Sequence, residues 1–149
     1  MRRNRLTVRP LAVILPMAGI LQFGAPGPGW AQSELEASVE WGRTAWLSHD
    51  YEALFASSDT VRLQLPEIGR HQAVTPAHAA RVLREYLSPA DEISFELLRI
   101  REASEDHAYA QLARRYVVRG TIDERVETVF LGFRRVAGRW RLREVRITP

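Results

Sequence analysis

Three tyrosines and one histidine–aspartate pair are the side chains best placed for acid–base or hydrogen-bond chemistry. Tyr51, Tyr86 and Tyr116 fall on the inward sides of predicted elements. A tyrosine hydroxyl there can donate to a ligand oxygen, although many core tyrosines only pack their rings and keep the hydroxyl at the surface. His49 and Asp50, adjacent between two predicted helices, give the sharpest enzyme hypothesis. Nothing else in the sequence supports that pair, so we assign no catalytic residue.

The other histidines and the lack of cysteine argue against a metal or thiol site. His71 and His78 lie seven residues apart across a predicted helix start, and the sequence offers no third metal ligand beside them. His107 follows an acidic turn that is typical of an exposed loop. The chain has no cysteine. It also has no glycine-rich phosphate loop, nucleophile elbow or metal-binding helix motif. We therefore predict neither a metal nor a cofactor.

Arginines crowd the last two predicted strands. Because arginine forks suit carboxylates and phosphates, an anion site is one interpretation. The alternative is a set of cross-strand ion pairs on a solvated face, with Glu127 and Glu144 as partners. We favour the ion pairs, because Arg141 and Arg143 alternate with apolar residues. The residues concerned are Arg134, Arg135, Arg139, Arg141, Arg143 and Arg146.

The first 31 residues predict a cleaved secretory signal. Four arginines precede any acidic residue, an apolar run follows over 11–23, and Gly29-Trp30-Ala31 puts small residues at −3 and −1. A retained anchor is the alternative, but 13 apolar residues form a helix of about 20 Å, short of a bilayer core of about 30 Å. We expect cleavage after Ala31 and a periplasmic or secreted protein that leaves the membrane.

Cleavage also changes what the charge implies. The whole chain has 21 basic and 18 acidic residues and a net charge of +3. The four signal arginines are lost on cleavage, which leaves 17 basic residues against 18 acidic ones, a net charge of −1. Nucleic-acid-binding domains usually carry a clustered basic patch, so we expect no nucleic-acid partner. Residues 32–149 are of ordinary size for a single domain.

Capping signals and hydrophobic periodicity predict three helices early in the chain. The first begins at a capping box, Ser33 to Glu36, and the second follows a capping aspartate, Asp50. The third begins at a Thr-Pro pair and stops at a Ser-Pro pair. The expected ranges are 33–48, 51–56 and 76–87.

Strict alternation predicts the strands. Residues 61–65 form the first, and residues 67–74 are expected to be a loop. Four strands follow residue 89, with Ile93, Phe95 and Leu97 expected on one face of the first of them. They cover 93–97, 107–119, 126–135 and 140–147, with a bulge near Arg143 or Glu144 in the last. The order α-α-β-α-β-β-β-β is of the α+β class.

Three stretches of the chain carry a resemblance to a known fold. They are VRLQLP at 61–66, AARVLREYL at 79–87 and GRWRLREVRI at 138–147. With the element order, they resemble the nuclear transport factor 2-like (cystatin-like) superfamily. More narrowly, they are similar to a bacterial domain family of unknown function within it. The resemblance covers nearly all of residues 34–148 and implies a cone: three helices on a strongly curved, mainly antiparallel sheet.

The resemblance further implies a cavity between the helices and the concave sheet face. Members of the superfamily use that cavity as a dehydratase or isomerase site, as a ligand pocket or as core, and many dimerise through the outer sheet face. Fold analogy does not choose among these. We favour non-enzymatic binding of a small apolar ligand or a protein partner, with a homodimer through the sheet; a small cofactor-free dehydratase or isomerase is the alternative. The expected ligand contacts are Trp46, Tyr51, Phe55, Tyr86, Tyr116 and Phe130.

Overall fold

Three helices form largely where the capping signals predict them. The computed structural model describes residues 28–149, and the side chains of all of these except 28, 30, 31 and 70–72. Most of the predicted secretory signal precedes residue 28 and lies outside the described residues, so export stays a prediction. The helices are α1 (Pro28–Leu47), α2 (Tyr51–Phe55) and α3 (Pro76–Leu87). Among the described residues, none of these helices is long and apolar enough to cross a membrane.

The helix starts confirm two of the three predicted caps. Asp50 Oδ1 accepts a hydrogen bond from the Ala53 backbone amide at 2.9 Å, and Thr75 Oγ1 accepts one from the His78 amide at 3.3 Å. The start predicted for the first helix is wrong, because α1 begins at Pro28 and Ser33 lies inside it. A proline is well tolerated at the first helical position, where its missing N–H has no partner to lose.

Within residues 28–149, six strands form one sheet in the order β2-β1-β6-β5-β4-β3. Neighbouring strands are antiparallel except for β1 and β6, which are parallel. The predicted α+β class with a mainly antiparallel sheet is confirmed. The strands are β1 (Val61–Leu65), β2 (Gly69–Val74), β3 (Ala90–Ser104), β4 (His107–Val118), β5 (Glu124–Val136) and β6 (Arg139–Thr148).

The loop predicted over residues 67–74 is wrong, because most of it is strand β2. Glu67 and Gly69 have φ values of 67° and 89°, which turn the chain sharply enough for β2 to pair with β1. As an edge strand, β2 hydrogen-bonds to β1 alone. It therefore lacks the strict alternation of apolar and polar residues that predicts a strand with one buried face.

The apolar stripe predicted for the first late strand is wrong at Ile93, whereas Phe95 and Leu97 do share one face, because they pair with the inward residues Arg114 and Leu112 of β4. Phe95 is 2% exposed, but Ile93 and Leu97 are 48% and 39% exposed. The register with β4 shifts at Ile93, a β-bulge. The bulge adds one residue, so Glu92 and Phe95 face the same side of the sheet although they are three apart. The bulge that the sequence predicted, near Arg143 or Glu144, is confirmed: the β5–β6 register skips Arg143.

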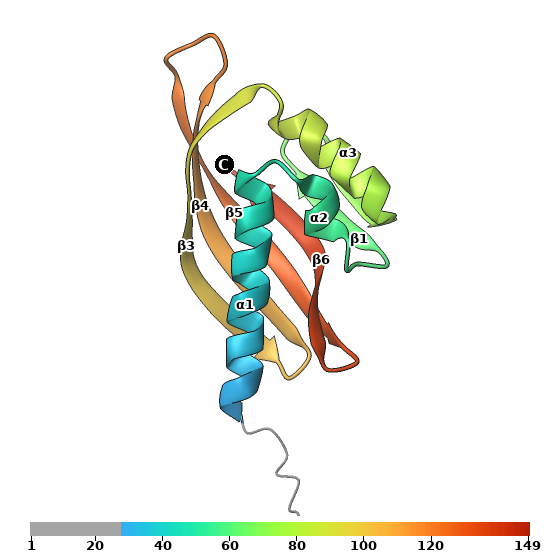
Figure 1. Cartoon of the computed structure of the whole chain (residues 1–149). Helices are drawn as coiled ribbons and strands as arrows, with labels where there is room; N and C mark the ends of the chain where they lie inside the picture. The colour runs from blue at the N-terminus through green and yellow to red at the C-terminus, as the bar shows by residue number, and fades with distance from the viewer. Residues whose placement is uncertain (1–27) are drawn as a thin grey trace, which may run out of the picture.

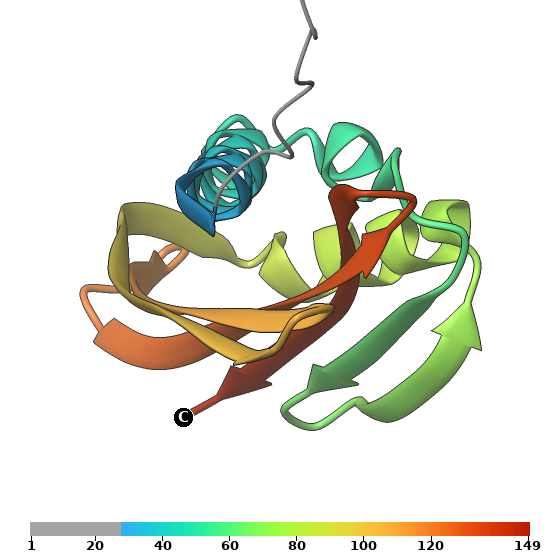
Figure 2. The same cartoon turned by 90° about the horizontal axis from the view of Figure 1, so that it is seen from below.

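The three helices cover one face of the curved sheet. Figure 1 shows α1 running along the sheet, with α2 and α3 beside β1, and Figure 2 shows the opposite face free of helices. We call the covered side the helix face and the other the outer face. Trp46 of α1 is fully buried and stacks on Phe95, with ring centroids 4.6 Å apart. Arg43 Nε donates to the Phe95 carbonyl at 2.9 Å, which ties α1 to β3.

Candidate functional site

A buried polar cluster lies on the helix face, between α3 and strands β3 to β5. Arg114 of β4 is 1% exposed and Glu127 of β5 is 7% exposed. Glu92 of β3 is almost as deeply buried. Tyr86 reaches the cluster from α3, and Tyr116 from β4. We call these five residues the inner cluster.

Arg114 holds two carboxylates in the inner cluster. Its Nε and Nη2 donate to Glu92 Oε1 at 2.9 and 2.7 Å, and its Nη1 donates to Glu127 Oε2 at 2.6 Å. Glu127 Oε1 accepts two more hydrogen bonds, from the Tyr86 hydroxyl at 2.8 Å and the Tyr116 hydroxyl at 3.1 Å. The guanidinium also lies 3.9 Å from the centre of the Tyr116 ring, in cation–π contact. The two carboxylates and one guanidinium leave a net charge of −1.

Strand alternation explains why charged residues face the helices. In β4 every second residue is buried, and Arg114 lies between Leu112 and Tyr116 in that series. In β5 Glu127 shares the phase of Val129. The sequence therefore held a signal for both residues, a charge in the inward phase, which the prediction overlooked. The interpretation of Glu127 as an outer-face partner of the late arginines is wrong, because the residue faces the helices.

Burial and charge tune the ionisation of the inner cluster. Burial, followed by the hydrogen bond to Glu127, raises the pKa of Tyr86 well above its ordinary value. Burial and the Glu127 charge raise the pKa of Tyr116 as well. Burial alone would lower the pKa of Arg114, but the hydrogen bonds and charges of Glu92 and Glu127 outweigh it and raise that pKa. At neutral pH both hydroxyls are therefore protonated and the guanidinium is charged.

The raised pKa of Tyr86 predicts a loss of stability at high pH. In the unfolded chain a tyrosine ionises at a pH of about 10, whereas folded Tyr86 ionises only at a higher pH. Above pH 10 the unfolded state thus holds fewer protons, and the free energy of unfolding falls as pH rises. Urea unfolding between about pH 9 and 11 should show a shallower fall in Tyr86→Phe than in the wild type. Equal slopes would contradict the raised pKa.

A pocket of about 520 Å³ opens beside the inner cluster. We call it the inner pocket. Tyr86, Arg114, Tyr116 and Glu127 line one part of it. The remaining wall is largely apolar, with Glu67 and Arg125 as further charged residues. The apolar lining comes from Pro66, Pro89, Ala90, Val118, Val126 and Pro149.

The structure brings two of the six predicted ligand contacts, Tyr86 and Tyr116, to the inner pocket. Trp46 and Phe55 are fully buried in the core. Tyr51 is also a core residue, and its hydroxyl lies 3.0 Å from His49 Nδ1. Burial and the Glu92 charge raise the pKa of Tyr51 to about 12.

The sixth predicted contact, Phe130, lies on the outer face. It is out of phase with its buried neighbours Val129 and Leu131. The Arg146 guanidinium stacks over its ring at 4.4 Å. Phe130 therefore cannot contact a ligand in the inner pocket.

The histidines do not assemble into a site among residues 28–149. Asp50 caps α2 and so does not pair with His49. His107 Nδ1 lies 2.8 Å from Asp106 in an exposed turn. No group of three metal-ligating side chains occurs in the described part of the chain, and the side chain of His71 lies outside it.

Comparison with known proteins relates the chain to solved structures. No family model and no curated protein matches its sequence. A ketosteroid isomerase-like protein from Erwinia carotovora atroseptica is similar in structure (TM-score 0.63, 21% identity, 78% of this chain and 96% of that one). So is a DUF4783 family protein from Bacteroides uniformis (TM-score 0.60, 15% identity, 72% and 93% covered).

A third similar structure is a proposed dehydratase of the nuclear transport factor 2-like family from Streptomyces avermitilis. Its TM-score is 0.63 at 14% identity, over 83% of this chain and 98% of that one. At such identities the likeness concerns the fold. The chain has the nuclear transport factor 2-like fold, which confirms the predicted resemblance.

Proposed function

We propose that this nuclear transport factor 2-like domain binds a small organic molecule in the inner pocket. The observation that carries the proposal is the convergence of Tyr86, Tyr116 and Glu127 on a partly apolar pocket of about 520 Å³. Ligand pockets of this kind combine apolar walls with a few placed polar groups that fix orientation. Ligand binding was also expected from the sequence, but for an apolar ligand.

The hydrogen bonds in the inner cluster favour a ligand whose polar group donates. Tyr86 and Tyr116 give their hydroxyl protons to Glu127. Their remaining lone pairs can only accept, because a hydroxyl carries one proton. The net charge of −1 on the inner cluster favours a neutral or cationic group further. The proposed ligand is therefore a hydroxyl or amine on an apolar body, which packs on the proline and valine wall.

The same bonds favour binding over acid–base catalysis. A general base needs a free lone pair within reach of the proton that it removes. Glu127 accepts two hydroxyl protons on one oxygen and an arginine proton on the other, so three of its roughly four lone pairs are already occupied. The raised pKa values keep Tyr86 and Tyr116 protonated at neutral pH, so neither serves as the base.

Matched probes test the proposal. Benzylamine, benzyl alcohol and benzoate share a ring and differ in the polar group, and amide resonances of Ala90 and Val118 report on the pocket. We expect saturable shifts with the amine and the alcohol, and none with benzoate. Tyr86→Phe should weaken benzylamine about fivefold, the value of one hydrogen bond. Tyr109→Phe, on the outer face, is the control and should leave the affinity unchanged.

Two results would contradict the proposal. One is the absence of saturable shifts at these amides with any of the three probes. The other is an equal loss of affinity in Tyr86→Phe and Tyr109→Phe. The expected homodimer through the sheet is independent of both and stays a prediction, which size-exclusion chromatography with light scattering can test.

A further inference from the structure

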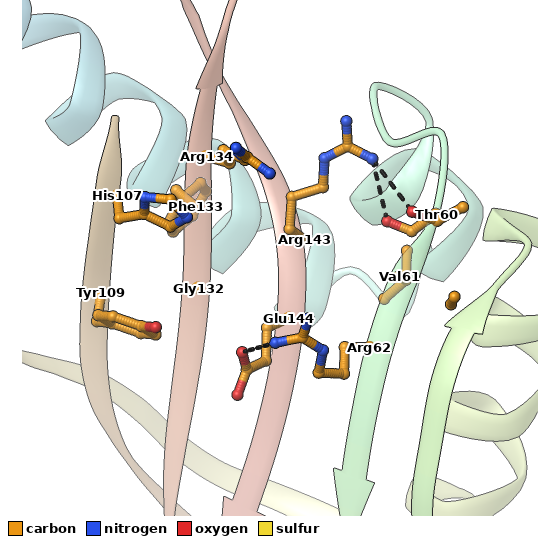
Figure 3. Close-up of a pocket in the computed structure, with 11 residues that line it drawn as sticks. Thr60, Val61, Arg62, His107, Tyr109, Gly132, Phe133, Arg134, Arg143 and Glu144 are labelled. Carbon is orange, nitrogen blue, oxygen red and sulfur yellow. Dashed lines mark hydrogen bonds and ion pairs between the residues drawn. The ribbon is translucent and has the colours of Figure 1, made fainter. Parts of the chain in front are cut away.

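A second pocket, of about 410 Å³, lies on the outer face. It spans the first residues of β1, the start of β4, the last third of β5 and the middle of β6, as Figure 3 shows. Gly132 forms part of its lining: a Cβ atom there would lie 2.9 Å from Glu144 Cβ and 3.2 Å from the Tyr109 ring. This close approach accommodates only glycine without a shift of the strands or of the ring. We call this hollow the outer pocket.

The bulge in β6 supplies the key cation of the outer pocket. Arg143 is the residue that the β5–β6 register skips. Its Nη2 donates to Asp59 at 2.9 Å, and its Nη1 makes two long contacts of 3.4 Å with Thr60. Its Nε is buried and has no hydrogen-bond partner among the described residues. A buried N–H without an acceptor is costly, so this atom favours an acceptor that enters the pocket.

A second guanidinium faces the same space. Figure 3 shows Arg134 on the side of β5 that faces Arg143, whose own guanidinium is turned toward Thr60, and both residues line the outer pocket. The ion-pair partner of Arg134 is Asp106, at 3.9 Å, a loose contact beside a half-exposed side chain. Two guanidinium groups repel each other unless an anion lies between them. Arginine forks fit the planar oxygens of a carboxylate or the oxygens of a phosphate.

The remaining charges of the outer pocket leave it basic. Arg62 also lines the pocket and forms an ion pair with Glu144 at 3.5 Å. Among the described residues, Glu144 is the one carboxylate in the pocket lining. That pairing removes both charges from the balance and leaves Arg134 and Arg143 in excess within the lining. Tyr109 and His107 add side chains that can donate hydrogen bonds.

We propose that the outer pocket binds a small anion, a carboxylate or a phosphate, between Arg134 and Arg143. The proposal is separate from the inner pocket, which lies on the other face of the sheet and favours a donor. Glu144 and the two exposed partners, Asp59 and Asp106, oppose anion binding, but exposed ion pairs contribute little. An anion that accepts hydrogen bonds from both guanidiniums can therefore displace Asp59 and Asp106.

The test is a titration of the folded protein with inorganic phosphate and, separately, with acetate at low ionic strength. We expect saturable shifts of the Arg143 Nε–Hε resonance. Arg134→Gln and Arg143→Gln should each weaken binding at least about tenfold. The control is Arg141→Gln, which removes the same charge from an arginine that also pairs with Asp59, at 3.7 Å, but does not line the pocket. It should change the affinity less than about twofold.

The two anions distinguish the ligand class. Tighter phosphate binding assigns the outer pocket to phosphates, and tighter acetate binding assigns it to carboxylates. Circular dichroism of the variants confirms that each remains folded. A linear, unsaturable response in the wild type would overturn the proposal. So would an equal loss in Arg141→Gln, because it would show general attraction to a basic surface.

Discussion

Replacing Arg114 with methionine should lower the free energy of unfolding by about 3–5 kcal/mol. The substitution removes the one cation that pairs with both Glu92 and Glu127. Two carboxylates then remain buried without a counter-charge, and that is far costlier than losing an exposed ion pair. Urea unfolding at pH 7 measures the loss, because a cooperative domain gives the free energy by linear extrapolation.

The adjacent residue provides the matched control. Arg115 lies on the same strand and pairs with Glu124, but it faces the outer side and is half-exposed. Arg115→Met should therefore change stability by less than about 1 kcal/mol. In Arg114→Met, neutralising both partners with Glu92→Gln and Glu127→Gln should restore part of the loss, since no unpaired charge remains. Equal small losses in Arg114→Met and Arg115→Met would contradict the buried cluster.

Replacing Trp46 with alanine should cost about 3–5 kcal/mol of unfolding free energy. The indole is fully buried, stacks on Phe95 and meets Tyr51 edge-on. Its removal leaves a cavity between α1 and β3 that the rigid sheet cannot close. Urea unfolding again gives the loss. Trp46→Phe retains a ring and should cost less.

The Trp46→Phe variant also tests whether Trp46 is a core residue or a ligand contact. Trp46 was predicted to touch a ligand, but the structure places it in the core, away from the residues that line the inner pocket. Trp46→Phe should therefore bind benzylamine as the wild type does. A Trp46→Phe protein of wild-type stability with weakened benzylamine binding would make Trp46 a ligand contact instead.

Local patterns in the sequence predicted most of the fold. The helix stops, the caps at Asp50 and Thr75 and the bulge in β6 follow from residue types at fixed spacings, and they are confirmed. Strand β2 was not predicted, because an edge strand can form without the alternation of apolar and polar residues. The bulge at Ile93 was not predicted, because it depends on the register with β4, in which Glu92 pairs with Tyr116 and Ser94 with Arg115.

The candidate site was harder to predict than the fold, for a physical reason. Tyr86 and Tyr116 were among the predicted ligand contacts, because a tyrosine in an inward phase is compatible with a core. Arg114 and Glu127 also lie at inward-facing positions of their strands. Each charge can be buried there without a large loss of stability only because the other is its ion-pair partner. The two residues are cross-strand partners on β4 and β5, and a single sequence does not fix the register that brings them together. Glu92 joins them only through the bulge.

The two pockets make opposite demands on their ligands. The inner pocket offers acceptors and a net negative cluster, whereas the outer pocket offers two guanidiniums. One sheet separates them, and they share no lining residue. Each proposal can therefore fail without the other, and the Tyr86→Phe and Arg143→Gln variants serve as controls for each other.

Intermolecular nuclear Overhauser effects test the central proposal, ligand binding in the inner pocket, most directly. With benzylamine bound to the carbon-13-labelled protein, we expect contacts from its ring protons to the methyl groups of Val118 and Val126, which line the pocket. A smaller groove of about 230 Å³ between α1 and β6 is lined by Leu54 and Leu142. Contacts to those two leucines, or to no methyl group, would contradict ligand binding in the inner pocket.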